Sequence, residues 1–114
     1  MNGYGAISKI LKKEGVEWIA CFPNNPLIEA VAKEGIRPIM FRQERGGIMA
    51  ADGYSRTMMG EKFGVFACQG GPGAENSYGG IAQAFADSVP IMFIPDGIPL
   101  YNSDVSPSFI SSKN

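Results

Sequence analysis

The segment Arg42-Gln43-Glu44-Arg45-Gly46-Gly47 places one acid between two arginines, where a predicted strand gives way to a predicted helix. A carboxyl group in that place can take part in proton transfer when its surroundings shield it from water. The alternative interpretation is structural, because a carboxylate in the first turn of a helix interacts favourably with the helix dipole. Glu44 is therefore the first candidate for acid–base chemistry, and these residues alone leave both interpretations open.

The second candidate is the glycine-rich segment Gly70-Gly71-Pro72-Gly73, which lies between a predicted strand and a predicted helix. Loops in that position bind ligands in many α/β proteins. The spacing is not that of the G-x-G-x-x-G motif, and the Gly-Lys-[Ser/Thr] of a phosphate-binding loop is missing. The segment therefore predicts either a tight turn or a loop whose backbone faces a ligand, and it gives little support to phosphate binding.

The chain of 114 residues contains no histidine, which is the usual general base and the commonest metal ligand. Ser-His-Asp hydrolysis, Cys-His chemistry and most zinc sites are thereby excluded within it, and we expect no metal site. A formal net charge of -1 without a Lys/Arg block favours neither a nucleic-acid nor a membrane partner. No membrane span or signal peptide is readable, so the predicted location is cytoplasmic. Cys21 and Cys68 each lie in an apolar run and are expected to be buried thiols at strand ends.

Predicted strands and helices alternate along the chain. Apolar residues spaced by three and four predict a helix over about 3 to 13 that ends near Gly15. Val16 to Phe22 predicts a buried strand, Pro23-Asn24-Asn25-Pro26 a turn, and Leu27 to Gly35 a second helix. The later predicted elements are a strand over 37–41, a helix over 43–59, a strand over 63–68, a helix over 74–86 and a strand over 90–95.

This alternation predicts the α/β class, as a three-layer sandwich with a doubly wound, mainly parallel sheet. The length is enough for one compact domain, which we place at residues 1–98. Residues 99–114 have no helical or strand period and predict an irregular connection. Because a fourth strand would normally be followed by another helix and strand, we expect the domain to be truncated.

Two long motifs in register resemble one family. Phe41 to Arg56 is similar to the Arg-x-Glu, Gly/Ala-rich helix and Ala-x-Gly-Tyr-[Ala/Ser]-Arg signature of thiamine-diphosphate enzymes related to acetolactate synthase. Gly70 to Asn76, followed by Gly80-Ile81-Ala82 and then Ala86 to Ile91, is similar to that family's second signature. The resemblance covers residues 3 to 98 and implies the N-terminal, pyrimidine-binding domain.

The resemblance implies a role for Glu44. In the family, the glutamate at this position hydrogen-bonds N1′ of the aminopyrimidine ring, and proton exchange there activates the cofactor. We expect Arg42 and Arg45 to point outward, because an inward guanidinium group would favour the ionised carboxylate. The segment Pro23-Asn24-Asn25-Pro26 resembles the family's proline loop. The cofactor-binding residues implied by this loop and the two motifs are Pro23, Asn24, Glu44, Gly70, Gly71 and Asn76.

Two amide residues are candidate substrate contacts by the same resemblance. Asn25 belongs to the proline loop, which lies near the reacting end of the cofactor in related enzymes, although many relatives carry Pro-Gly where this chain has Pro23-Asn24. Gln69 precedes the glycines, where some relatives have a His or Thr that faces substrate. For each amide the alternative role is to brace its own loop.

The resemblance implies an acetolactate synthase-like lyase or transferase that acts on a 2-oxo acid with thiamine diphosphate. The family holds Mg²⁺ on the diphosphate with a second domain that is absent here, so we expect the isolated chain to be inactive. The alternatives are a 2-oxo-acid decarboxylase subunit and a non-catalytic pyrimidine-like dimerisation module, and Glu44 argues against the second. A flavodoxin-like nucleotide binder would need a phosphate-loop spacing that the sequence lacks.

Small side chains on two predicted helices lead us to expect a homodimer or a larger oligomer. These residues are Gly46, Gly47, Ala50, Ala51 and Gly53 on one helix, and Gly79, Gly80, Ala82 and Ala86 on the other. Such faces permit close contact between helices of two subunits. The alternative is that the small residues pack each helix tightly within its own domain.

Overall fold

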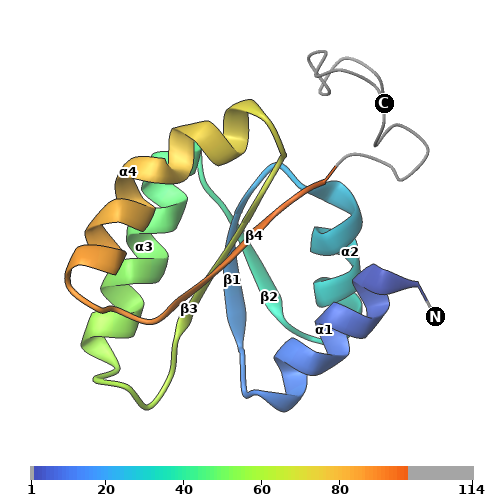
Figure 1. Cartoon of the computed structure of the whole chain (residues 1–114). Helices are drawn as coiled ribbons and strands as arrows, with labels where there is room; N and C mark the ends of the chain where they lie inside the picture. Colours follow the sequence, from blue (N-terminus) through green and yellow to red (C-terminus); the bar gives the residue numbers. More distant parts are fainter. Residues whose placement is uncertain (1, 98–114) are drawn as a thin grey trace.

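Residues 2–97 are described by the computed structural model, and of Asn25 only the backbone is described. Within this range helices and strands alternate, as Figure 1 shows. Their order is α1 (Gly3–Lys13), β1 (Trp18–Phe22), α2 (Asn25–Lys33), β2 (Arg37–Met40), α3 (Glu44–Thr57), β3 (Gly64–Cys68), α4 (Pro72–Ala86) and β4 (Ile91–Pro95). The connection predicted for residues 99–114 lies outside the described part of the chain.

The strands form one sheet in the order β2-β1-β3-β4, and each neighbouring pair is parallel. Trp18 lies opposite Arg37, and Phe66 lies opposite both Ala20 and Phe93. Helices α1 and α2 lie on one face of the sheet, and α3 and α4 lie on the other (Figure 1). The predicted α/β class with three layers is confirmed.

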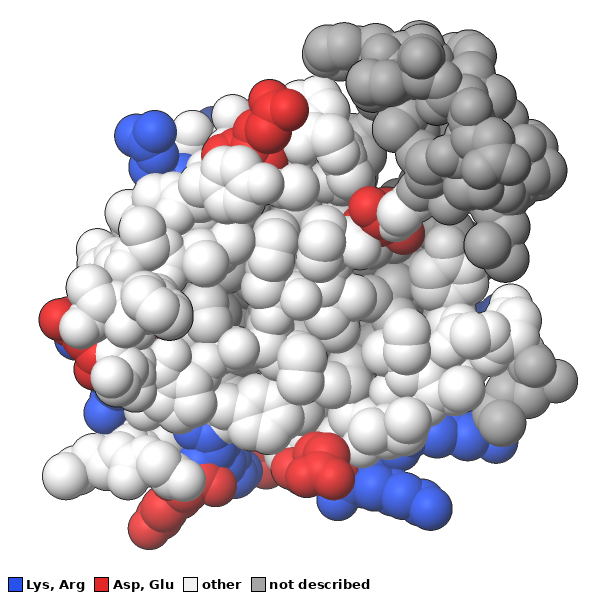
Figure 2. Space-filling model, viewed as in Figure 1, with Lys and Arg blue, Asp and Glu red and all other residues white. Residues whose placement is uncertain are grey.

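The face of the molecule through which the edge strand β4 runs is largely free of charge. Figure 2 shows white residues across most of this face, with Lys, Arg, Asp and Glu gathered toward its periphery. The five residues of β4, Ile91 to Pro95, include no charged side chain. This face therefore differs from the usual charged surface of a protein domain.

Local chemistry explains where the helices begin. The Asn2 side chain accepts a hydrogen bond from Gly5 N at 3.0 Å and caps α1. Helices α2 and α4 begin two residues earlier than predicted, at Asn25 and Pro72. Each has a proline in its first two positions, where the missing N–H would have no partner in the helix. The prolines were interpreted as parts of turns, and they initiate helices instead.

Each face of the sheet has its own buried apolar cluster. On one face Ile19, Val31 and Val65 are at most 1% exposed. On the other face the main buried side chains, those of Ile48 and Phe66, are fully covered. The two cysteines are divided between the clusters, both fully buried and free, as expected. Burial raises the pKa of each thiol to about 11.

Helices α3 and α4 lie side by side and contact each other at four successive turns (Figure 1). The contacting pairs are Glu44 with Asn76, Ile48 with Gly80, Asp52 with Gln83, and Arg56 with Asp87. We refer to these four pairs as the α3–α4 ladder. Because both helices start at the carboxyl ends of strands, the pair Glu44–Asn76 lies at that end and Arg56–Asp87 at the other.

Glycines make the close approach of these helices possible. A Cβ atom at Gly80 would overlap the side chain of Ile48, and a Cβ atom at Gly47 would overlap the ring of Phe66. These small residues pack inside the domain, which is the alternative considered for them. Others face open space, since a Cβ atom at Gly53 or Gly79 would meet nothing within 4 Å. Some of the small residues therefore allow close packing inside the domain, and others lie on its open surface.

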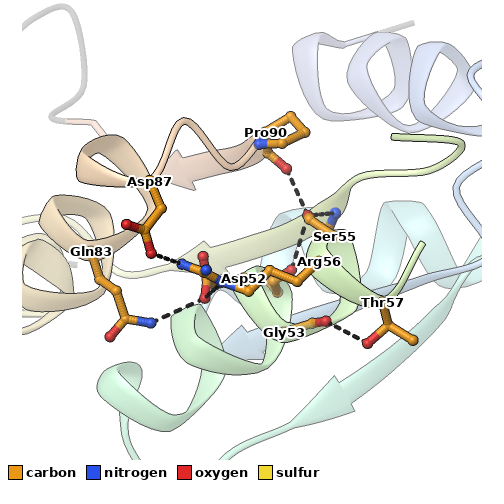
Figure 3. Close-up of polar contacts among 10 residues, drawn as sticks. Asp52, Gly53, Ser55, Arg56, Thr57, Gln83, Asp87 and Pro90 are labelled. Carbon is orange, nitrogen blue, oxygen red and sulfur yellow. Dashed lines mark hydrogen bonds and ion pairs between the residues drawn. The ribbon is translucent and has the colours of Figure 1, made fainter. Parts of the chain in front are cut away.

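The far end of the ladder is a polar network, drawn in Figure 3. Arg56 Nε lies 2.8 Å from Asp52 Oδ2, and Arg56 Nη2 lies 2.7 Å from Asp87 Oδ2. Gln83 Nε2 donates to the same Asp52 oxygen at 3.1 Å. Next to them the Ser55 hydroxyl donates to the carbonyl oxygen of Pro90 at 2.6 Å and accepts from Gly64 N at 2.7 Å. The network fastens α3 to α4 and to the starts of β3 and β4.

Candidate functional site

The carboxyl ends of the four parallel strands lie along one edge of the sheet, which is the edge where α/β domains bind ligands. The segments that leave this edge contain most of the residues predicted for the site. Pro23 and Asn24 follow β1, Glu44 follows β2, and Gly70 and Gly71 follow β3. The structure therefore brings these predicted residues to one edge, which we term the carboxyl edge.

Glu44 is the first residue of α3 and is 8% exposed. Its Oε2 atom accepts a hydrogen bond from Asn76 Nδ2 at 3.2 Å. Within residues 2–97, Oε1 has no hydrogen-bond partner, and it is not among the atoms sealed from the surface. Glu44 thus combines a shielded carboxyl group with one oxygen left free for a ligand.

Gly73 lies beside Glu44 Oε1, and it was not among the predicted site residues. A Cβ atom at this position would lie 3.3 Å from Glu44 Oε1, which is tighter than an ordinary contact, and 3.5 Å from Cys68 Sγ. Its place in the glycine-rich segment was the available signal, but the segment alone could not show which glycine faces the acid. A glycine here leaves room beside the carboxyl group.

The two arginines that flank Glu44 in the sequence are both exposed, as expected. Among the described residues, the ion pairs join Arg56 to Asp52 and Asp87, and Lys62 to Glu17. Glu44 belongs to none of them. The Glu44 carboxyl group instead contacts the neutral amide of Asn76, a residue exposed at the surface.

Asn24 is only 3% exposed and links two loops of the carboxyl edge. Its Nδ2 atom donates to the carbonyl oxygen of Cys68 at 3.4 Å, which ties the proline loop to the end of β3. Its Oδ1 atom is buried without a partner among the described residues. An unpaired buried acceptor is costly, so such atoms are often satisfied by water or a ligand. Asn24 therefore braces the edge and also offers a free acceptor.

Asp96 and Tyr4 extend this buried corner, and the sequence analysis did not predict either as a site residue. Tyr4 OH donates to Asp96 Oδ1 at 3.5 Å, a long hydrogen bond. Burial raises the pKa of Asp96, and hydrogen bonds from Tyr4 and Asn24 partly oppose that rise. Asp96 directly follows β4. The rule that α/β domains bind ligands at the carboxyl ends of their strands therefore indicates Asp96 as well as Glu44.

Local packing explains two of the predicted glycines. A Cβ atom at Gly70 would overlap the backbone of Asp96, and Gly71 has a φ angle of 63°, which other residues rarely adopt. Both observations agree with the tight turn that was one interpretation of this segment. Whether their backbone also faces a ligand stays a prediction.

The two predicted substrate residues are placed differently. Gln69 lies directly after β3 at the carboxyl edge and is half-buried. Asn25 is the first residue of α2 rather than part of a free loop, and its side chain lies outside the described atoms. A substrate contact by either residue stays a prediction.

The described surface is hollowed in places away from Glu44. A shallow groove of about 260 Å³ between α1 and α2 is lined in part by Tyr4, Pro26, Glu29 and Lys33. A much smaller hollow beside Trp18 and Tyr54 lies at the opposite end of the sheet from the carboxyl edge. None of the described helices is long and apolar enough to cross a membrane.

A parallel α/β domain with a shielded carboxyl group, a buried amide and a glycine turn at its carboxyl edge has the features of a small-molecule-binding domain. A family model described as "Thiamine pyrophosphate enzyme, N-terminal TPP binding domain" matches residues 1–110. The chain belongs to this family.

Several relatives are acetolactate synthases. The chain is 34% identical over 102 residues to "Acetolactate synthase, chloroplastic" of Arabidopsis thaliana, a match that covers 86% of the chain and 15% of the relative. It is 39% identical over 95 residues to "Acetolactate synthase large subunit" of Lactococcus lactis, covering 80% and 16%. For "Probable acetolactate synthase large subunit" of Methanocaldococcus jannaschii the identity is 38% over 102 residues, covering 87% and 17%. The chain thus spans about one sixth of the length of these homologues.

Proposed function

We propose that this chain is the pyrimidine-binding part of a thiamine-diphosphate-dependent enzyme of the acetolactate synthase type, and that Glu44 activates the cofactor through N1′. The proposal depends above all on the carboxyl group of Glu44, which is almost fully buried yet keeps one oxygen without a protein partner among the described residues. Homology to acetolactate synthase large subunits supports the cofactor.

The residues at the carboxyl edge fit an aminopyrimidine ring. Glu44 Oε1 is free to meet a ring nitrogen, Gly73 leaves space beside it, and the Oδ1 atom of Asn24 is a buried acceptor that lacks a partner. Bound thiamine diphosphate supplies a thiazolium carbon that adds to the carbonyl group of a 2-oxo acid. Glu44 would hold and exchange a proton at Oε1, and the ring bound over this oxygen would shield that proton from water.

We further propose that Gln69 and Asn25 face the substrate, that Gly70, Gly71 and Pro23 complete the ring site, and that Asn76 belongs to this site through its contact with Glu44. The diphosphate and its Mg²⁺ would be held by a second domain, in the same polypeptide or in another subunit. A 2-oxo-acid decarboxylase would use the same half-site.

We propose a homodimer or larger oligomer as the active assembly. Among the large apolar side chains, Tyr78 is 63% exposed and Phe85 is 85% exposed, both on α4, and Met92 of β4 is 43% exposed. Helix α4 and strand β4 both run across the largely uncharged face that Figure 2 shows. Burial of such a surface against a partner is favourable. Sedimentation equilibrium over a hundredfold concentration range would test this, and a mass that stays monomeric would contradict it.

The role of Glu44 is tested by Glu44→Gln in the cofactor-bound assembly. The amide cannot exchange the proton, so we expect hydrogen–deuterium exchange at C2 of thiamine diphosphate to slow by about 10² to 10⁴ fold. The exchange rate is measured by proton NMR after rapid mixing with D₂O and acid quenching.

The matched control is Glu75→Gln, which removes an exposed carboxylate from the first turn of α4. We expect this variant to exchange at the rate of the unaltered protein. Unchanged exchange in Glu44→Gln, with cofactor still bound, would remove Glu44 from its proposed role and with it the main support for this function.

A further inference from the structure

The side chain of Asn76 contacts Glu44, the proposed acid of the site, directly. It lies in the second turn of α4, and its Nδ2 atom is 3.2 Å from Glu44 Oε2. Within residues 2–97 this is the one hydrogen bond that the Glu44 side chain makes. The amide of Asn76 is therefore the group on this chain that can fix the orientation of the carboxyl group.

The position of Asn76 follows from the packing of the two helices. One turn further along, Gly80 lets α4 approach Ile48 of α3 so closely that a Cβ atom could not fit. This close approach brings Asn76 within hydrogen-bond distance of Glu44 one turn earlier. The more distant pairs of the α3–α4 ladder hold the same helices in register through Asp52 and Gln83.

The chemistry of the amide distinguishes the two carboxyl oxygens. A side-chain NH₂ group only donates hydrogen bonds, so the oxygen facing it acts as an acceptor. A protonated carboxyl group carries its hydrogen on one oxygen, and its other, carbonyl oxygen is the stronger acceptor, so a hydrogen bond from Asn76 to Oε2 favours the proton on Oε1. Oε1 is also the atom with no partner among the described residues, and the neighbouring Gly73 has no side chain that would crowd it.

From these contacts we propose that Asn76 is a positioning residue for Glu44: it accommodates Oε2, places the exchangeable proton on Oε1 and aims that oxygen at the cofactor ring. This inference deepens the proposed function and rests on it. Asn76 then affects the proton exchange more than it affects cofactor affinity, because its contact is to the acid.

The first measurement needs no cofactor. In the ¹⁵N-labelled chain, the side-chain Nδ2 protons of Asn76 are followed by NMR, and Glu44→Ala is expected to move one of them upfield because its acceptor is gone. The side-chain amide of Gln83, which donates to Asp52, is the matched control and should not move. An Asn76 resonance that is unchanged in Glu44→Ala would overturn the contact and the inference.

The second measurement uses the cofactor-bound assembly. We expect Asn76→Ala to slow C2 hydrogen–deuterium exchange by about tenfold, the effect of losing one hydrogen bond to an acid, while the Kd for thiamine diphosphate changes by less than about threefold. Because Asn76 is exposed, the variant is expected to fold, which circular dichroism checks. A large rise in Kd with unchanged exchange would overturn the inference and make Asn76 a direct cofactor ligand.

The two proposals fail in different ways. Unchanged exchange in Glu44→Gln would defeat the proposed function itself. Strongly slowed exchange in Glu44→Gln together with full exchange in Asn76→Ala would leave the function standing and remove only the positioning role. If Asn76→Ala does not fold, the NMR comparison with Glu44→Ala still decides the question.

Discussion

At the amino ends of the strands, helices α3 and α4 are joined by an arginine, two carboxylates and an amide, whereas at the carboxyl edge a single amide joins them. The first group makes contacts of 2.7 to 3.1 Å, and the second makes one contact of 3.2 Å. Both ends belong to the same pair of helices. Among the described residues Asp52 Oδ1 at the far end also lacks a partner, but it is sealed from the surface, whereas Glu44 Oε1 at the near end is not. The difference indicates that the far end fastens the helices and the near end keeps an oxygen within reach of a ligand.

The largest loss of stability is expected at the fastened end, from Ser55→Ala. The change removes the partner of the buried Gly64 N and of the carbonyl oxygen of Pro90, an exposed residue, and a buried group without a partner costs free energy. We expect the free energy of unfolding to fall by about 1 to 3 kcal/mol, measured by urea denaturation. Asn76→Ala at the other end should change it by less than about 0.5 kcal/mol. Equal losses at both ends would contradict the comparison.

A smaller loss is expected from Arg56→Gln, which removes both ion pairs of the far end. Asp52 would keep only the hydrogen bond from Gln83, and Asp87 is already exposed to solvent. The urea midpoint should therefore fall less than in Ser55→Ala. Because Arg56 is partly exposed, the loss should shrink in high salt, where charges are screened. Lys62→Gln, which breaks the exposed pair with Glu17, is the control and should have little effect.

An opposite change is expected from Gly79→Ala on the outer face of α4. A Cβ atom there meets nothing within 4 Å, and alanine favours the helix over glycine. We expect the free energy of unfolding to rise by about 0.5 to 1 kcal/mol with cofactor exchange unaltered. A loss of stability in the isolated chain would show that the outer face is packed rather than open.

The last effect is confined to alkaline pH and concerns the two thiols. Burial raises the pKa of Cys21 and Cys68 to about 11, so above pH 9 the unfolded chain loses protons that the folded chain keeps. The thiols' contribution to stability should thus be complete below about pH 9 and should be lost as the pH rises toward 11. Urea midpoints between pH 8 and pH 10.5 test this, and Cys68→Ala should flatten the decline. A midpoint independent of pH in this range would contradict it.

The layered fold could be predicted from the sequence because apolar spacing and glycine turns are local signals. Helix starts at Asn25 and Pro72 were missed because a proline is compatible with both a turn and a first helical turn. Glu44 was found through its motif. Its hydrogen bond with Asn76 could not be predicted, because the two residues are 32 positions apart and meet only through the packing of two helices. The same applies to Asp96 and Tyr4, which meet only when the sheet is complete.

The contact between Gly80 and Ile48 limits which substitutions these two positions can accept during evolution. A Cβ atom at position 80 would overlap the side chain at position 48, so neither position can accept a larger residue alone. A change at position 80 survives only in a lineage where position 48 has already become smaller, and the order of the two substitutions matters. The pair is therefore expected to covary among homologues, although neither residue bears a functional group that takes part in chemistry.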